Sequence, residues 1–264
     1  EVVDFMPIAN GPYGCILIRK VTVIRGKVEV SMDCCPRFDY ARATHTAWQE
    51  GGQIMFRSDQ DGTHFRLASD VPMQLNGNDA SALFTLQEKE TAHFVFQMLP
   101  SAPVAQDPFG DAQAMARNIE AVFMETVRYW KDWTRQSAYK GRWADMVNRS
   151  ALVLKLLTSR KYGAPVAAAT FGLPEEVGGV RNWDYRYTWI RDAAFTMYAF
   201  IRLGFLHEAE HFMEWIRTQF DKNVDAGGGL QLMYAVDGTA ELHETSLDHL
   251  EGYAGSRPVR IGNA

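Results

Sequence analysis

The side chains best suited to chemistry are concentrated in residues 178–192 (GGVRNWDYRYTWIRD). Residues 181–192 alone contain three arginines, two aspartates, two tryptophans and two tyrosines, and an apolar stretch follows directly. This mixture suits a sugar, because aromatic rings cover the apolar C–H face of a pyranose while Asp and Arg groups bind its hydroxyls. A buried ion-pair network that caps the following helix, with the tryptophans in the core, fits the same residue types. Both interpretations stay open at this level.

Other groupings of carboxylates and histidines offer weaker chemistry. Glu175 and Glu176 are adjacent and follow Pro174, which is typical of a surface turn. His243 and His249 are six residues apart in an acidic stretch, whereas a zinc-binding helix places two histidines at i and i+4. We therefore expect no metal site and no cofactor.

Charge and hydropathy argue against two classes of partner. The formal net charge is −5, so the chain lacks the cationic surface of a nucleic-acid-binding protein. Its most apolar stretch, residues 193–203, is interrupted by Thr196 and Arg202 and is shorter than the ~20 residues that span a bilayer. We expect no nucleic acid and no membrane as partner, and the sequence indicates no particular oligomeric state.

The cysteines and the two ends of the chain give weaker indications. Three cysteines, of which Cys34 and Cys35 are adjacent, do not resemble a disulfide framework and predict a reduced, cytoplasmic protein. The chain begins at Glu1 without an initiator Met, and a sequence motif ends at Ala264. We therefore expect a fragment that is truncated at both ends.

Residues 1 to about 100 alternate with a period of two, which is typical of strands with one buried face. Val21 and Val23 precede Gly26, and Val28 and Val30 follow it, which predicts a hairpin with a tight turn at Gly26. Many short strands with polar turns indicate an antiparallel sandwich. Further strands are expected at residues 53–57, 63–68, 82–86 and 93–99, with turns at 61–62 and 76–77.

Three prolines in residues 100–110 interrupt this pattern and predict a linker. The period then becomes helical, with apolar residues at steps of three and four. Helices are expected at about residues 112–133, 144–159, 192–203 and 207–220. The second and third are apolar nearly all round, so we expect them to be covered on both sides.

Several of these segments resemble one enzyme family. Residues 178–192, with residues 173–176 (LPEE) before them, are similar to glycoside hydrolase family 15, the family of glucoamylases and bacterial trehalases. The resemblance implies an α+β multidomain protein, in which an antiparallel β-supersandwich precedes the first part of an (α/α)6 toroid. We accordingly expect a β-sandwich domain at residues 1–105, a linker with a helix at 106–142 and the partial toroid at 143–264. Further similar segments are residues 3–7 (VDFMP), 36–40 (PRFDY), 141–143 (GRW), 149–155 (RSALVLK) and 252–264 (GYAGSRPVRIGNA).

The resemblance also implies an activity and a set of substrate-binding residues. The implied enzyme is an inverting, exo-acting α-glucosidase of glucoamylase type, which releases glucose from the ends of α-glucans or maltooligosaccharides. Asp192 and Arg191 match residues that bind the hydroxyls of the terminal glucose, and Trp189 matches the wall beside its ring. Tyr185 matches a tyrosine near the attacking water, and Arg257 matches a further arginine on the substrate side.

Two other functions remain open. An α,α-trehalase shares the fold and the first glucose site, so the residues above discriminate poorly between the two substrates. A non-catalytic carbohydrate-binding module is the alternative from a different class. Gly255 stands where fungal glucoamylases place a stacking tryptophan, which indicates different subsites beyond the first glucose.

The catalytic carboxylates that the resemblance implies are expected after the position of Ala264. An inverting hydrolase needs a carboxylic acid on the leaving oxygen and a carboxylate that activates water on the opposite face of the sugar. At ~11–12 residues per helix plus connections, residues 143–264 have room for about four helices of the toroid. We therefore expect this segment to contain no catalytic residue and to be inactive alone.

Overall fold

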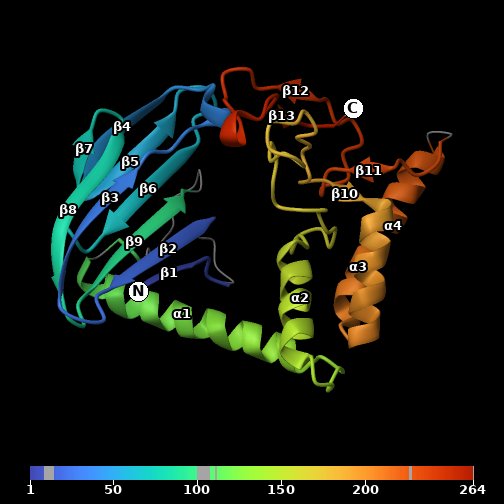
Figure 1. The fold of residues 1–264 in the computed structure, drawn as a ribbon, viewed down its shortest axis with the longest axis horizontal. Helices are drawn as coiled ribbons and strands as arrows, with labels where there is room; N and C mark the ends of the chain where they lie inside the picture. Colours follow the sequence, from blue (N-terminus) through green and yellow to red (C-terminus); the bar gives the residue numbers. More distant parts are fainter. Residues whose placement is uncertain (9–14, 100–107, 111, 226–227, 264) are drawn as a thin grey trace. The chain divides into compact units, whose positions relative to one another are not determined.

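Two antiparallel sheets form most of the first half of the chain in the computed structural model, which describes residues 1–8, 15–99, 108–110, 112–225 and 228–263 (Figure 1). The chain divides into two compact units, Glu1–Lys131 and Asp132–Ala264. The fold class is α+β, as the sequence predicts. The boundaries expected near residues 105 and 142 stay predictions.

The larger sheet has six strands in the order β1-β2-β9-β6-β5-β4, and the smaller sheet has three in the order β3-β8-β7. All neighbouring strands in both sheets are antiparallel. The strands of the larger sheet are β1 (Val2–Phe5), β2 (Ile16–Thr22), β4 (His45–Glu50), β5 (Gln53–Ser58), β6 (His64–Ser69) and β9 (Thr91–Met98). Those of the smaller sheet are β3 (Lys27–Cys34), β7 (Gln74–Asn76) and β8 (Asp79–Gln87).

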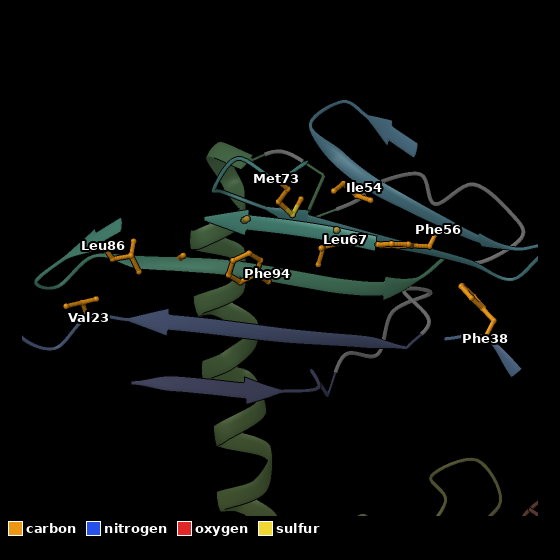
Figure 2. Packing of buried hydrophobic residues seen from close by; sticks show 11 residues of the cluster. Val23, Phe38, Ile54, Phe56, Leu67, Met73, Leu86 and Phe94 are labelled. Carbon is orange, nitrogen blue, oxygen red and sulfur yellow. The ribbon is translucent and has the colours of Figure 1, made fainter. Parts of the chain in front are cut away.

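The core of the first unit lies between the two sheets (Figure 2). Phe56 on β5 and Phe94 on β9 meet Leu86 of the smaller sheet in one buried cluster. Because successive side chains on a strand point to opposite faces, Ile18 and Val95 lie on the other face of the larger sheet. There they pack with Met115 and Ile119 of helix α1 (Ala112–Arg135), so helix, large sheet and small sheet form three layers.

The predicted hairpin at Gly26 is wrong. Gly26 does adopt a positive φ of 79°, but β2 and β3 on its two sides belong to different sheets. Strand β2 pairs with β1 and β9, and β3 pairs with β8. The period of two identifies a strand and its buried face without identifying its partner, so the chain crosses between sheets where a hairpin was expected.

The other strand predictions are confirmed as β5, β6, β8 and β9. The predicted turns are also present, since Gly62 and Gly77 have φ of 70° and 63°. Strands β1, β4 and β7 were not expected. Of the predicted linker, residues 100–107 lie outside the described residues.

Four helices follow the predicted pattern. Besides α1, they are α2 (Ala144–Leu156), α3 (Ile190–Leu203) and α4 (Leu206–Asp225). Helix α2 ends before the expected residue 159, because the Ser159 amide bonds to the Ala164 carbonyl in a turn. Helix α3 ends at Gly204, whose φ of 90° suits a helix C-terminus. No described helix is both long and apolar enough to cross a membrane.

Helices α2 and α3 are not covered on both sides, contrary to expectation. Phe195 on α3 is 70% exposed and Leu156 on α2 is 67% exposed, while Phe200 and Ala151 are buried. Each helix therefore buries one face and leaves an apolar face open, because the described chain provides no second layer for it.

One buried carboxylate joins the helices of the second unit. The Trp133 indole stacks on Phe205 with ring centroids 4.0 Å apart, and its Nε1 donates to Glu208 Oε1 at 2.7 Å. Lys155 Nζ of α2 lies 3.0 Å from the same oxygen. Burial alone would raise the pKa of Glu208, but the Trp133 and Lys155 hydrogen bonds outweigh it and hold the pKa below its ordinary value.

Short paired strands and single turns complete the second unit. Strand β10 (Thr188–Trp189) pairs with β11 (Met233–Tyr234), and β12 (Thr245–Ser246) pairs with β13 (Arg260–Ile261). A 3-10 turn, η2 (Tyr253–Gly255), precedes Arg257, and another, η1 (Asp39–Ala41), lies in the first unit. Residues 178–192 therefore lead through β10 directly into α3 (Figure 1).

Candidate functional site

The first half of residues 178–192 is a buried ion-pair network. The Asp184 side chain is 0% exposed and accepts from Arg186 Nε at 2.9 Å and from Arg186 Nη2 at 2.8 Å. The backbone amides of Arg186 and Gly262 also donate to it, both at 3.1 Å. Arg186 Cζ lies 4.3 Å from the centroid of the Phe171 ring. This carboxylate is fully occupied by the protein, so the structural interpretation holds for this half.

Asn182 fastens the same half to a distant segment. Its side chain is fully buried, and Nδ2 donates to the carbonyl oxygens of Pro258 at 3.0 Å, Gly179 at 3.2 Å and Ser256 at 3.4 Å. The Gly178 amide donates to Ser256 Oγ at 2.8 Å. These contacts hold residues 178–184 beside residues 256–263.

Trp183 is half-buried, like Trp189, and takes part in this fastening through Arg260. Arg260 Cζ lies 5.4 Å from the Trp183 ring centroid, and Arg260 Nη1 donates to the Val180 carbonyl at 2.9 Å. Arg260 Nε is also 3.2 Å from Glu244 Oε1. One tryptophan of the pair therefore serves packing, which leaves Trp189 as the candidate for sugar contact.

The C-terminal end of the segment is partly accessible. Trp189 is half-buried in β10, and its indole Nε1 has no hydrogen-bond acceptor among the described residues. Arg191 Cζ lies 5.9 Å from the Trp189 ring centroid, and Arg191 Nε lies 3.2 Å from Asp192 Oδ1. The side chains of Arg191 and Asp192 are 69% and 41% exposed. The structure thus brings together three of the five predicted binding residues, of which Arg191 and Asp192 have partly exposed side chains while Nε1 of Trp189 is buried.

Asp192 lies in the first turn of α3, as expected for a carboxylate favoured by the helix dipole. The helix begins at Ile190, two residues before the expected start. The short strand pair β10–β11 fixes the direction from which the chain enters the helix. Rigid elements on both sides therefore hold Trp189, Arg191 and Asp192.

Tyr185 has a partner that the sequence did not indicate. Its hydroxyl lies 3.5 Å from Glu175 Oε1, and the other oxygen of Glu175 lies 3.1 Å from Arg181 Nε. Burial raises the pKa of Tyr185, and the neighbouring Glu175 charge raises it further. The phenol stays protonated at neutral pH and can donate a hydrogen bond. Glu175 was interpreted as part of a surface turn, and it is indeed exposed.

Arg257 is exposed and connects to the segment only through its neighbours on the chain. The carbonyls of Ser256 and Pro258, one on each side of it, both accept from Asn182. Ser256 and Val259 are buried, which anchors the loop around an exposed guanidinium. Among the described residues, no cluster of three or more His, Cys, Asp or Glu side chains could hold a metal ion.

Comparisons with known proteins agree with the motif. Residues 141–264 match the family model for glycosyl hydrolases family 15. The chain is 37% identical over 256 residues to a trehalase of Mycolicibacterium smegmatis, in an alignment that covers 94% of this chain and 37% of that protein. The chain belongs to glycosyl hydrolase family 15. The resemblance inferred from residues 178–192 is thereby confirmed.

Two further proteins named trehalase are similar over the whole chain. A trehalase of Thermoplasma volcanium is 30% identical over 275 residues, covering 100% of this chain and 40% of that protein. Trehalase 1 of Sulfolobus acidocaldarius is 31% identical over 265 residues, covering 100% of this chain and 42% of that protein. The chain thus spans about two fifths of the length of these relatives. All five predicted binding residues lie within the part that matches the family 15 model.

Proposed function

We propose that this chain supplies the glucose-binding part of an inverting glycoside hydrolase that cleaves trehalose. The observation that carries the proposal is the accessible group of Trp189, Arg191 and Asp192 at the start of α3. Its side chains offer an aromatic face, a hydrogen-bond donor and a carboxylate within one short segment. Membership of family 15 supports a glycoside as the substrate.

Each of the three side chains has a task in this proposal. Asp192, in the first turn of α3, accepts hydrogen bonds from two hydroxyls of the glucose. Arg191 donates to a neighbouring hydroxyl and is already aligned by its contact with Asp192. Trp189 covers the apolar face of the ring with its half-buried indole.

Tyr185 and Arg257 complete the proposed site. The Tyr185 hydroxyl donates its hydrogen to Glu175, and its oxygen can accept a hydrogen bond from the attacking water or from a sugar hydroxyl. Arg257 offers an exposed guanidinium to the second sugar. We propose no acid or base among the residues of this chain, so the two carboxylates of an inverting mechanism, ~6.5–9.5 Å apart, come from other parts of the protein.

Trehalose is preferred to α-glucans as the substrate, although the sequence led first to a glucoamylase-type activity. The names of the similar proteins support trehalose. Gly255, where fungal glucoamylases place a stacking tryptophan, also disfavours a long glucan beyond the first glucose. We further propose that the sheets belong to a β-supersandwich, that α2–α4 belong to an (α/α)6 toroid, and that the free cysteines reflect a reducing compartment such as the cytoplasm.

Glucose release by the full-length protein tests the substrate. Purified protein is incubated separately with trehalose and with maltotriose, and free glucose is measured over time. The proposal predicts glucose from trehalose at a much higher kcat/KM than from maltotriose. The opposite preference would move the assignment to an exo-acting α-glucosidase, and release from neither sugar would reject both.

A further inference from the structure

We propose that Asn182 is a positioning residue that holds Arg257 in the orientation needed to bind the substrate. The inference rests on the proposed function, because it takes Arg257 as a substrate contact. Asn182 lies in the buried half of residues 178–192 and cannot touch a sugar itself. Its effect would therefore reach the substrate through the backbone around Arg257.

The geometry ties Asn182 to both neighbours of Arg257. Its Nδ2 donates to Pro258 O at 3.0 Å and to Ser256 O at 3.4 Å, so the two carbonyls that flank Arg257 converge on one side-chain amide. The third acceptor of Nδ2 is Gly179 O at 3.2 Å, within the same segment as Asn182. One primary amide therefore sets the path of the backbone on both sides of Arg257.

Neighbouring contacts make this arrangement stiff. Gly178 donates its amide to Ser256 Oγ at 2.8 Å, and Leu247 donates its amide to Val259 O at 2.8 Å. The backbone of Gly252 also packs closely against the Ser256 carbonyl oxygen, because a Cβ at Gly252 would collide with that oxygen. The backbone of Arg257 is fixed although its side chain is exposed, which is how a binding group is preorganised.

An amide suits the position of Asn182. Its NH2 group has two hydrogens for three carbonyl oxygens, so one hydrogen is shared, whereas a hydroxyl has one hydrogen and a carboxylate has none. Its Oδ1 has no hydrogen-bond partner among the described residues. Burying an unpaired acceptor is unfavourable, so the hydrogen bonds from Nδ2 are the contribution that Asn182 makes.

A double-mutant cycle on the full-length protein tests the inference. Asn182→Ala, Arg257→Ala and the double variant are compared with wild type for kcat and KM with trehalose, and for Tm. Asn182→Ser is made in parallel, because its hydroxyl keeps one hydrogen-bond donor without burying a charge, so it remains informative if the alanine variant fails to fold. In the protein that keeps Arg257, we expect Asn182→Ala to lower kcat/KM about tenfold, mainly by raising KM. In the protein that already carries Arg257→Ala, we expect the same change to lower kcat/KM less than about twofold.

Asn263→Ala is the matched control. Asn263 Nδ2 donates to Asp184 O at 3.1 Å and so fastens the same two segments, but at a distance from Arg257 in the sequence. If the inference holds, Asn263→Ala lowers Tm and changes KM little. Equal losses of kcat/KM from Asn182→Ala in both backgrounds, or an equal rise in KM in Asn263→Ala, would show a merely structural role and overturn the inference.

The outcomes also separate this inference from the proposed function. Wild-type kinetics in Arg257→Ala would remove Arg257 from the proposed site, and the inference would fall with it. A full loss in Arg257→Ala combined with wild-type kinetics in Asn182→Ala and Asn182→Ser would overturn the inference alone. If the wild-type protein prefers maltotriose, the trehalase assignment fails and the same cycle, measured with maltotriose, still decides the role of Asn182.

Discussion

Asp184 and Arg186 form a two-pronged ion pair within one short segment, with Nε···Oδ1 and Nη2···Oδ2 distances of 2.9 and 2.8 Å. This pair belongs to the part of the segment that holds the fold, while the partly exposed side chains of Arg191 and Asp192 lie at its C-terminal end. Asp184 turns its carboxylate toward the distant amide of Gly262, while Asp192 leaves its own carboxylate open. The same residue types thus take opposite tasks within one motif.

The first prediction concerns the stability provided by Asp184. Asp184→Ala should lower the free energy of unfolding by about 3 kcal/mol, because it leaves Arg186 and the Gly262 amide without their partner. Urea denaturation measures the change. Asp192→Ala is the control, since its ion pair is exposed and its removal should cost less than about 1 kcal/mol. Equal costs in the two variants would contradict the division of the motif.

The second prediction is a pH dependence of stability through Glu208. Its pKa in the folded protein is lowered by the Trp133 and Lys155 hydrogen bonds in spite of burial. A lowered folded pKa adds stability above the unfolded pKa, and that stability is lost as the pH falls through the folded value. The free energy of unfolding should therefore decrease below the ordinary Glu pKa of 4.5, and Glu208→Gln should flatten this decrease.

The matched control for Glu208 lies two residues along the same helix. Glu210 is exposed on α4, so Glu210→Gln should leave the pH profile of the wild type nearly unchanged. The free energy of unfolding is measured by chemical denaturation at several pH values, from neutral pH down to values below the ordinary Glu pKa. A wild-type slope retained in Glu208→Gln would show that other carboxylates cause the acid sensitivity.

The separation of the motif into two parts marks the limit of what the sequence predicts. The helical period identified α1 to α4 because it depends on neighbours three and four residues apart. The pairing of β2 and β3 depends on partners far along the chain, so the sequence wrongly predicted a hairpin at Gly26. The Asp184–Gly262 contact joins residues 78 apart, and no local pattern reports such a bond. Sequence reasoning therefore found the segment but could not tell which of its aspartates is buried.

The third prediction concerns the open apolar faces of the helices. Phe195 on α3 and Met213 on α4 are exposed, and a cleft of about 470 Å³ lies along α4 beside Met213, Phe220 and Leu230. Apolar patches of this kind promote association. The 264-residue chain alone should self-associate in sedimentation velocity, and Phe195→Glu with Met213→Glu should shift it toward the monomer.

A charge control is available on the same helix. Arg202 is exposed on α3, so Arg202→Glu makes the chain more acidic without removing apolar surface. It should leave the association unchanged. A wild-type chain that sediments as a monomer at every concentration would contradict the prediction.

The most direct test of the central claim is the kinetics of Asp192→Ala in the full-length protein with trehalose. Hydrogen bonds to the terminal glucose strengthen toward the transition state, so kcat/KM should fall by at least about 100-fold while Tm stays near that of the wild type. Wild-type kcat/KM in this variant would show that the group at the start of α3 does not bind the sugar.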